Sequence, residues 1–148
     1  MTKMNGFTLI ELLVTIAVIA ILATIAVPSF NSILNNQKLN ASTRELMSKI
    51  AEARTQAVTL RQTTGVCLST VSDCASALSI TTNQTNRVYI AQLEKNVVAG
   101  TGSATQIAFR VEGIPITTAK FTLTRNGQSR CVEVGITGDT YYKEGACT

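Results

Sequence analysis

The chain contains no histidine and no tryptophan, and aromatic residues make up only 5% of its 148 residues. The absence of histidine excludes nucleophilic sites built on a Ser–His or Cys–His pair and metal sites built on imidazole. The sequence also lacks a glycine-rich phosphate loop, and the carboxylates Glu94, Glu112, Glu133 and Asp139 have no spacing that suggests a paired acid–base site. We therefore expect a protein that is not an enzyme and that uses no cofactor or metal.

Charge is nearly absent from the first part of the chain, where Glu11 is the only charged residue between Phe7 and Phe30. A helix of this length, at about 1.5 Å per residue, can cross a bilayer core of about 30 Å. A carboxylate in such a segment is costly unless a partner neutralises it, and cleavage after Gly6 would supply one as the new α-amino group of Phe7. An ordinary signal peptide or a plain membrane anchor explains neither the Gly–Phe junction nor the glutamate.

The order of residues in this stretch resembles that of a type IV prepilin. Residues 6–11 read Gly-Phe-Thr-Leu-Ile-Glu, Leu-Leu-Val follows, and Pro28 lies further along. The resemblance implies that a prepilin peptidase cuts between Gly6 and Phe7 and that the new N-terminal Phe7 is N-methylated. It also implies that Glu11 serves assembly with other major and minor pilins, and that Pro28 kinks the helix. The expected location is the inner membrane, with the head in the periplasm, and then a pilus or pseudopilus.

The sequence predicts four segments. Residues 1–6 are a short leader, residues 7–30 the transmembrane and assembly helix, residues 31–64 an amphipathic helix, and residues 65–148 a β-sheet head. The amphipathic helix is indicated by a stripe that recurs in alternating steps of four and three residues. The members of this stripe are Leu39, Thr43, Leu46, Ile50, Ala53, Ala57 and Leu60. Gly65 is the expected stop just past the helix.

Short β-type runs separated by turn residues predict a small, mainly antiparallel sheet in the head. The expected strands are residues 66–70, 87–95, 106–111, 120–125, 130–136 and 140–143. Residues 71–77 are expected as a turn and residues 99–104 as a loop. Asn126-Gly127 is a strong hairpin signal between two strands, and Thr137-Gly138-Asp139 is a weaker one. The fold class is therefore α+β and type IV pilin-like, with a long N-terminal helix packed on this sheet.

Four cysteines lie beyond the apolar segment. An even number in a translocated domain predicts two disulfides, although four cysteines allow three pairings. Proximity along the chain favours Cys67–Cys74 and Cys131–Cys147, because each pair closes a loop that short strands and turns can span. Zinc is the rival interpretation, but the cysteine spacings contain no C-x₂-C pair and the chain has no histidine.

The head resembles the minor-pilin and pseudopilin group that contains FimT, FimU and GspH. The resemblance rests on Ile107–Phe109, Gly113, Phe121–Leu123 and Val132–Gly138. Some DNA-uptake members of this group carry a Gly-Arg-x-Arg motif in the last turn. The corresponding residues here read Gly138-Asp139-Thr140-Tyr141, and an acid in place of the first arginine argues against a DNA receptor.

Three functions are compatible with this sequence. The first is a minor pilin that contributes to the initiation, tip or assembly of a type IV pilus, and the second is a pseudopilin of a type II secretion system. The third is a DNA-binding minor pilin for natural transformation, with Arg125 and Arg130, which flank one hairpin turn, and Lys143 as the main phosphate contacts. Further basic candidates for this third function are Arg87, Lys95, Arg110 and Lys120.

Overall fold

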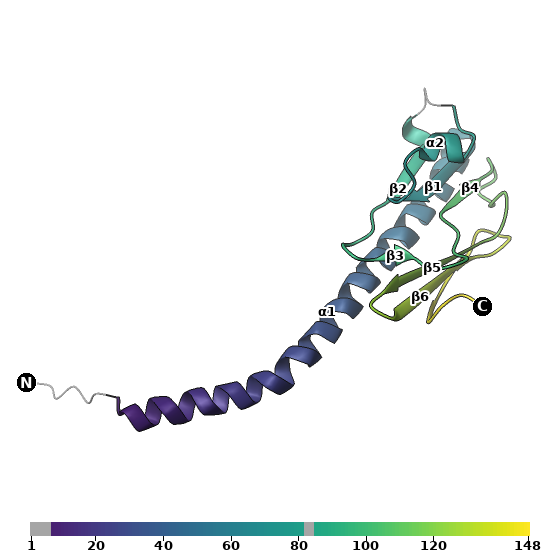
Figure 1. The fold of residues 1–148 in the computed structure, drawn as a ribbon. Helices are drawn as coiled ribbons and strands as arrows, with labels where there is room; N and C mark the ends of the chain where they lie inside the picture. The colour runs from purple at the N-terminus through teal and green to yellow at the C-terminus, as the bar shows by residue number, and fades with distance from the viewer. Residues whose placement is uncertain (1–6, 82–84) are drawn as a thin grey trace, which may run out of the picture. The chain divides into compact units, whose positions relative to one another are not determined.

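The computed structural model describes residues 7–81 and 85–148 (Figure 1). The chain divides into two compact units, Met1–Leu34 and Asn35–Thr148. One continuous helix, α1 (Leu9–Leu60), belongs to both of them. The expected leader and its cleavage-site residue Gly6 lie outside the described residues.

The first unit consists of the apolar part of α1. Its most apolar stretch is long enough to cross a membrane, and none of that stretch is buried in the structure. Ile10, Leu13 and Leu22 are more than half exposed, as a membrane-spanning helix would be in the absence of lipid. The helix assignment continues through Pro28, and the kink expected there stays a prediction.

The second part of α1 packs against the sheets of the head through the expected stripe. Leu39, Leu46, Ile50, Ala53 and Ala57 are fully buried, and the stripe's Thr43 is 2% exposed. The alanines let the helix approach the strands closely, since they place no side chain beyond Cβ in the interface. The last expected member, Leu60, is partly exposed because the helix ends there.

The end of α1 differs from the expectation. Arg61 takes a left-handed conformation with φ of 51°, and the Gln62 amide donates to the Ala57 carbonyl at 3.2 Å. This is the hydrogen bond of a Schellman motif, formed here without glycine at a cost of about 1 kcal/mol. The prediction that Gly65 stops the helix was wrong, because Gly65 lies inside the first strand. A Cβ at Gly65 would meet the Ile107 carbonyl oxygen at 2.9 Å, so this glycine permits close strand packing.

The described residues of the head form two small sheets where the sequence predicted one. The first has the order β2-β1-β4, in which β1 pairs with β2 in parallel and with β4 antiparallel. The second has the order β3-β5-β6-β7, and all of its pairs are antiparallel. A mainly antiparallel head is therefore confirmed. The strands are β1 (Thr64–Leu68), β2 (Val88–Ala91), β3 (Val98–Ala99), β4 (Gln106–Phe109), β5 (Ala119–Arg125), β6 (Gln128–Val134) and β7 (Thr140–Glu144).

The chain between β1 and β2 contains helical turns where the sequence predicted only turn and loop. They are α2 (Cys74–Ala77) and the 3-10 helix η1 (Thr85–Arg87), and Figure 1 shows α2 beside β1 and β2. Asp73 caps α2, because its Oδ1 accepts from the Ser76 amide at 3.1 Å. A connection of this kind is needed because parallel strands cannot be joined by a tight hairpin.

The hairpin β5–β6 forms where Asn126-Gly127 predicted it. Asn126 and Gly127 have φ of 47° and 79°, the positive values of a type I′ turn, and Arg125 pairs with Gln128 across it. The core of the head is made mostly of aliphatic side chains. Its two largest fully buried residues are Phe109 and Phe121.

Both disulfides pair as proximity along the chain predicted. Cys67–Cys74 joins β1 to α2, with a Cα–Cα distance of 5.8 Å. Cys131–Cys147 joins β6 to the C-terminal tail across 5.0 Å. The second bond closes the β6–β7 hairpin covalently, so that the last residues are held on the sheet.

Candidate functional site

The N-terminus of α1 carries the glutamate expected to serve assembly. The Glu11 carboxylate Oε2 accepts from the Thr8 amide at 2.9 Å and from the Thr8 hydroxyl at 2.7 Å. The Glu11 amide donates back to the Thr8 hydroxyl at 3.3 Å. These reciprocal bonds form a capping box, with Thr8 as the N-cap and Glu11 three residues later. The Thr-x-x-Glu spacing is the sequence signal for this cap, whereas the apolar setting of Glu11 had pointed only to the Phe7 amine as its partner.

The surroundings of Glu11 are apolar and uncovered. Phe7 is 76% exposed, and it lines a shallow groove of 370 Å³ together with Ile10, Glu11 and Val14. Among the described residues, Glu11 Oε1 has no hydrogen-bond partner. The capping box therefore holds the carboxylate at the helix end with one oxygen available to a second group.

The two arginines proposed as DNA contacts point into the head. Arg125 is 9% exposed, donating its Nε to Asn35 Oδ1 at 3.0 Å and a terminal NH₂ group to the Lys95 carbonyl. Arg130 donates to Asn36 Oδ1 at 3.1 Å and to Asn40 Oδ1 at 3.2 Å. The three asparagine acceptors lie on α1, about 90 residues away in the chain, a separation at which one sequence carries no pairing signal. The hairpin turn brings Arg125 and Arg130 to the helix rather than to an exposed tip.

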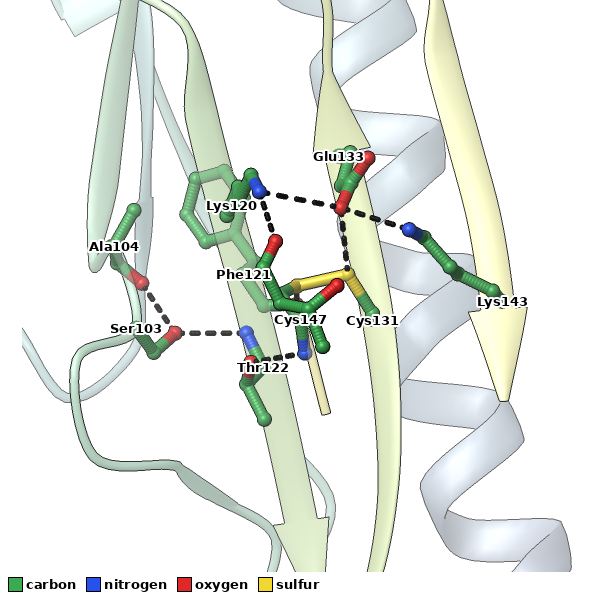
Figure 2. Close-up of a disulfide and its surroundings, with 10 residues drawn as sticks. Ser103, Ala104, Lys120, Phe121, Thr122, Cys131, Glu133, Lys143 and Cys147 are labelled. Carbon is green, nitrogen blue, oxygen red and sulfur yellow. Dashed lines mark hydrogen bonds and ion pairs between the residues drawn. A yellow bond between two sulfur atoms is a disulfide. The ribbon is translucent and has the colours of Figure 1, made fainter. Parts of the chain in front are cut away.

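Lys143, the third candidate, is also engaged. Its ammonium lies 3.1 Å from Glu133 Oε1, and that of Lys120 lies 3.7 Å from the same oxygen. Figure 2 shows Glu133 between the two lysines, next to the Cys131–Cys147 disulfide. The hydrogen bond from Lys143 lowers the pKa of the Glu133 carboxyl, so the carboxyl remains charged and paired to lower pH than usual.

The same disulfide brings together atoms that resemble a metal-ligand set. The sulfurs of Cys131 and Cys147 and a carboxylate oxygen of Glu133 lie within 4.8 Å of one another. Metals bind cysteine as thiolate, whereas both sulfurs here are bonded to each other. Glu133 is already neutralised by two lysines, so this cluster does not offer a cation site.

The turn that carries the DNA-uptake motif in some relatives is fixed on α1 by Arg54. The Arg54 guanidinium donates to the carbonyls of Thr137 at 3.0 Å and Gly138 at 3.2 Å, and its charge lies 3.6 Å from Asp139. Gly138 has φ of 83°, and a Cβ there would lie 2.9 Å from the Gly113 carbonyl oxygen. The acid at position 139 is thus the charge partner of a helix residue.

Two family models match the chain. Residues 42–139 match the family described as type II transport protein GspH, and residues 1–27 match the prokaryotic N-terminal methylation motif. The chain belongs to the GspH family. This assignment places it among the minor pilins and pseudopilins, as the resemblance of its two halves indicated.

Structural comparison gives the same fold. The crystal structure of the Pseudomonas aeruginosa type IV minor pilin FimU is similar, with a TM-score of 0.54 and 17% sequence identity. The match covers 76% of this chain and 97% of the FimU chain. A comparison with curated protein sequences finds no match. At this level of identity, the likeness to FimU shows the pilin fold and nothing finer.

Proposed function

We propose that this GspH-family protein is a minor pilin that helps to initiate a type IV pilus or to form its tip. The observation that carries the proposal is the first part of α1, whose apolar side chains are exposed on all sides in the structure. Such a surface needs lipid before assembly and the helices of other pilins afterwards. The GspH-family head is a compact unit of its own.

The proposal includes processing of the N-terminus. A prepilin peptidase cleaves between Gly6 and Phe7, and Phe7 is then N-methylated, as the match of residues 1–27 to the methylation motif supports. The head lies in the periplasm, which supplies the oxidising conditions that its two disulfides require. No cofactor takes part, since the proposed task is assembly.

Glu11 has a specific place in this assembly. Apolar helix packing alone defines the register of neighbouring helices poorly, whereas an ion pair between Glu11 and a neighbour's Phe7 amine defines it well. The capping box with Thr8 prepares this pairing, because it fixes the carboxylate and leaves Oε1 available. A carboxylate left unpaired in the low-dielectric bundle would be costly, so subunits in the wrong register are disfavoured.

The test is Glu11→Ala in cells that make the filament. We expect normal cleavage after Gly6, because the peptidase acts at the junction, and a lower filament-associated fraction of the mature protein. The two forms are separated by mass, and shear fractions are compared on immunoblots. Thr24→Val is the matched control, since Thr24 is another polar residue of the same helix that lies outside the groove of Glu11, and its hydroxyl donates to the Ile21 carbonyl at 2.7 Å. Normal incorporation of Glu11→Ala would refute the pairing, and failed cleavage would assign Glu11 to the peptidase step.

A pseudopilin of a type II secretion system is the second candidate. It is favoured by the description of the matching family, which is a type II transport protein. Both systems use the same helix and processing signals, so the residues described above serve either one. Deletion of the gene distinguishes them: loss of surface pili with normal protein secretion supports the first proposal, and the reverse supports the second.

A further inference from the structure

The contact between α1 and the rest of the head changes character along the helix. From Leu46 to Ala57 the fully buried side chains are apolar, namely Leu46, Ile50, Ala53 and Ala57, and the part-buried Arg54 beside them bonds to the β6–β7 turn. At the first turns of the head, polar side chains contribute to the contact beside the fully buried Leu39. The helix contributes three amides there, Asn35, Asn36 and Asn40, and the hairpin β5–β6 contributes the donors.

Asn35 is the centre of the first group of bonds. Its Oδ1 accepts from Arg125 Nε at 3.0 Å and from Asn126 Nδ2 at 3.1 Å. Arg125 also donates to the Lys95 carbonyl, in the connection between β2 and β3. A single helix side chain thus ties the last residue of β5 and the hairpin turn, while Arg125 ties a second loop.

Arg130 makes the second group from the opposite strand of the hairpin. Its guanidinium reaches Asn36 and Asn40, which lie one helical turn apart, and its side chain is 11% exposed. It also contacts Glu144 of β7 at 3.3 Å and the Ser129 carbonyl at 2.9 Å. The planar fork of arginine can satisfy several acceptors at once, which a lysine cannot do in the same geometry.

We propose that these residues form a polar lock, defined as Asn35, Asn36, Asn40, Arg125 and Arg130, that holds the hairpin end of the second sheet on α1. The lock lies where the helix enters the head, since the compact unit begins at Asn35. Directional hydrogen bonds fix both the rotation and the axial position of the helix, whereas apolar contacts tolerate sliding. Displacement by one turn would leave two nearly buried guanidinium groups without their acceptors, which is strongly unfavourable.

The lock opens as a local unit, separate from the apolar contact further along α1. This follows because its bonds are confined to the helix entry and the hairpin, and because the fully buried residues lie mainly beyond it. The two arginines are therefore positioning residues for the head, which accounts for their burial in a way that DNA contact does not.

Hydrogen exchange of the full chain in detergent micelles tests the lock. In Asn35→Leu, which keeps the size but removes the acceptor, we expect amides of residues 35–42 and of the β5–β6 hairpin to exchange about 10- to 100-fold faster. Amides of residues 46–57 keep their protection. Asn35→Asp retains an acceptor for Arg125 and is expected to preserve wild-type protection. Gln37→Leu is the matched control, because Gln37 is an exposed residue of the same helical turn.

Three results would overturn the proposal. Unchanged exchange rates in Asn35→Leu would show that the bonds to Asn35 do not stabilise the contact between the hairpin and α1. An equal loss of protection over residues 46–57 would show that the substitution destabilises the whole head. Asn35→Asp behaving like Asn35→Leu would show that the acceptor is irrelevant. Arg125→Lys is an independent test, since it keeps the positive charge but removes the planar guanidinium group. It should reproduce the local loss of amide protection expected for Asn35→Leu.

Discussion

At the scale of single residues, the charges of the head are used mainly within the molecule. Arg54 fixes the β6–β7 turn, Arg125 and Arg130 bind asparagines of α1, and Glu133 joins two lysines. A guanidinium that donates to protein acceptors and is nearly buried has little left for a phosphate. Whether the basic side chains of the head can bind DNA therefore depends on where they lie, and not on how many there are.

Asp139→Arg is predicted to loosen the β6–β7 turn without creating a DNA receptor. The new guanidinium would face Arg54, whose charge now lies 3.6 Å from Asp139, so attraction would become repulsion. Both groups are substantially exposed, so we expect only a small loss of unfolding free energy, on the order of 0.5 kcal/mol. Urea unfolding measures the first effect and a DNA titration the second. Asp139→Asn, which removes the attraction without adding a positive charge and keeps the Arg54 bonds to the turn, is the control, and tight DNA binding by either variant would contradict the prediction.

Individual features of the head were predictable from the sequence where their signal was local. The Asn126-Gly127 turn and both cysteine pairs depend on residues close to one another along the chain, and the structure has them as expected. The arginine–asparagine bonds connect residues about 90 positions apart, and asparagine in a helix carries no mark of its partner. The hypothesis that Arg125 and Arg130 cluster at an exposed hairpin tip therefore missed their bonds to α1, whereas Lys143 lies on the surface.

At the scale of elements, the long helix and the longer strands follow from periodicity, while the shorter elements do not. Strand β3 has two residues and α2 has four, too few for an alternating or helical pattern to show. The division into two sheets could also not be predicted from the sequence. The reason is that β1 and β2 pair in parallel across a connection that contains α2, and no hairpin turn marks this pairing. The stripe on α1 was predictable because five of its members contact one continuous core.

The C-terminal element depends on its disulfide. Strand β7 is an edge strand with mostly exposed side chains, and Cys131–Cys147 joins the tail behind it to β6. The double variant Cys131→Ser/Cys147→Ser is predicted to lose about 3 kcal/mol of unfolding free energy, because the sixteen-residue separation no longer restricts the unfolded chain. Urea unfolding of residues 31–148 measures this loss.

The matched variant Cys67→Ser/Cys74→Ser separates the two disulfides. It should leave the amides of β7 protected in hydrogen exchange, since that bond joins β1 to α2. In Cys131→Ser/Cys147→Ser the same amides should exchange faster than those of β5. An unchanged unfolding midpoint in this variant would mean that the β6–β7 pairing alone holds the tail.

At the scale of the whole molecule, the chain separates two tasks. The first unit presents an apolar helix with one carboxylate held by Thr8, which suits lipid and other pilin helices. The second unit has its own core, two disulfides and internally paired charges. The first task is proposed from a short motif, which matches the prokaryotic N-terminal methylation motif over residues 1–27. The head carries no comparable signal, since its fold is specified by packing.

DNA binding by the head is predicted to be weak and non-specific. The chain has a net charge of +4, but Arg125, Arg130 and Lys143 are already engaged, which leaves scattered cations such as Lys95 and Arg110 for phosphate contacts. Such contacts release few counterions, so the affinity of residues 31–148 for duplex DNA should be weaker than about 1 μM at physiological salt and fall further as salt rises. Fluorescence anisotropy over a salt series measures the affinity and its slope.

Two variants distinguish weak phosphate contacts from a specific DNA site. Lys95→Ala/Arg110→Ala should weaken the residual binding and flatten its salt dependence, because these side chains act only through phosphates. Arg125→Ala should instead destabilise the head, since it removes the donors to Asn35 and to the Lys95 carbonyl. Suppose instead that the head bound DNA in the nanomolar range, and that Arg125→Ala abolished binding with an unchanged unfolding midpoint. Arg125 would then have to leave its buried position to contact DNA, and the DNA-uptake function would replace the pilus-assembly function proposed here.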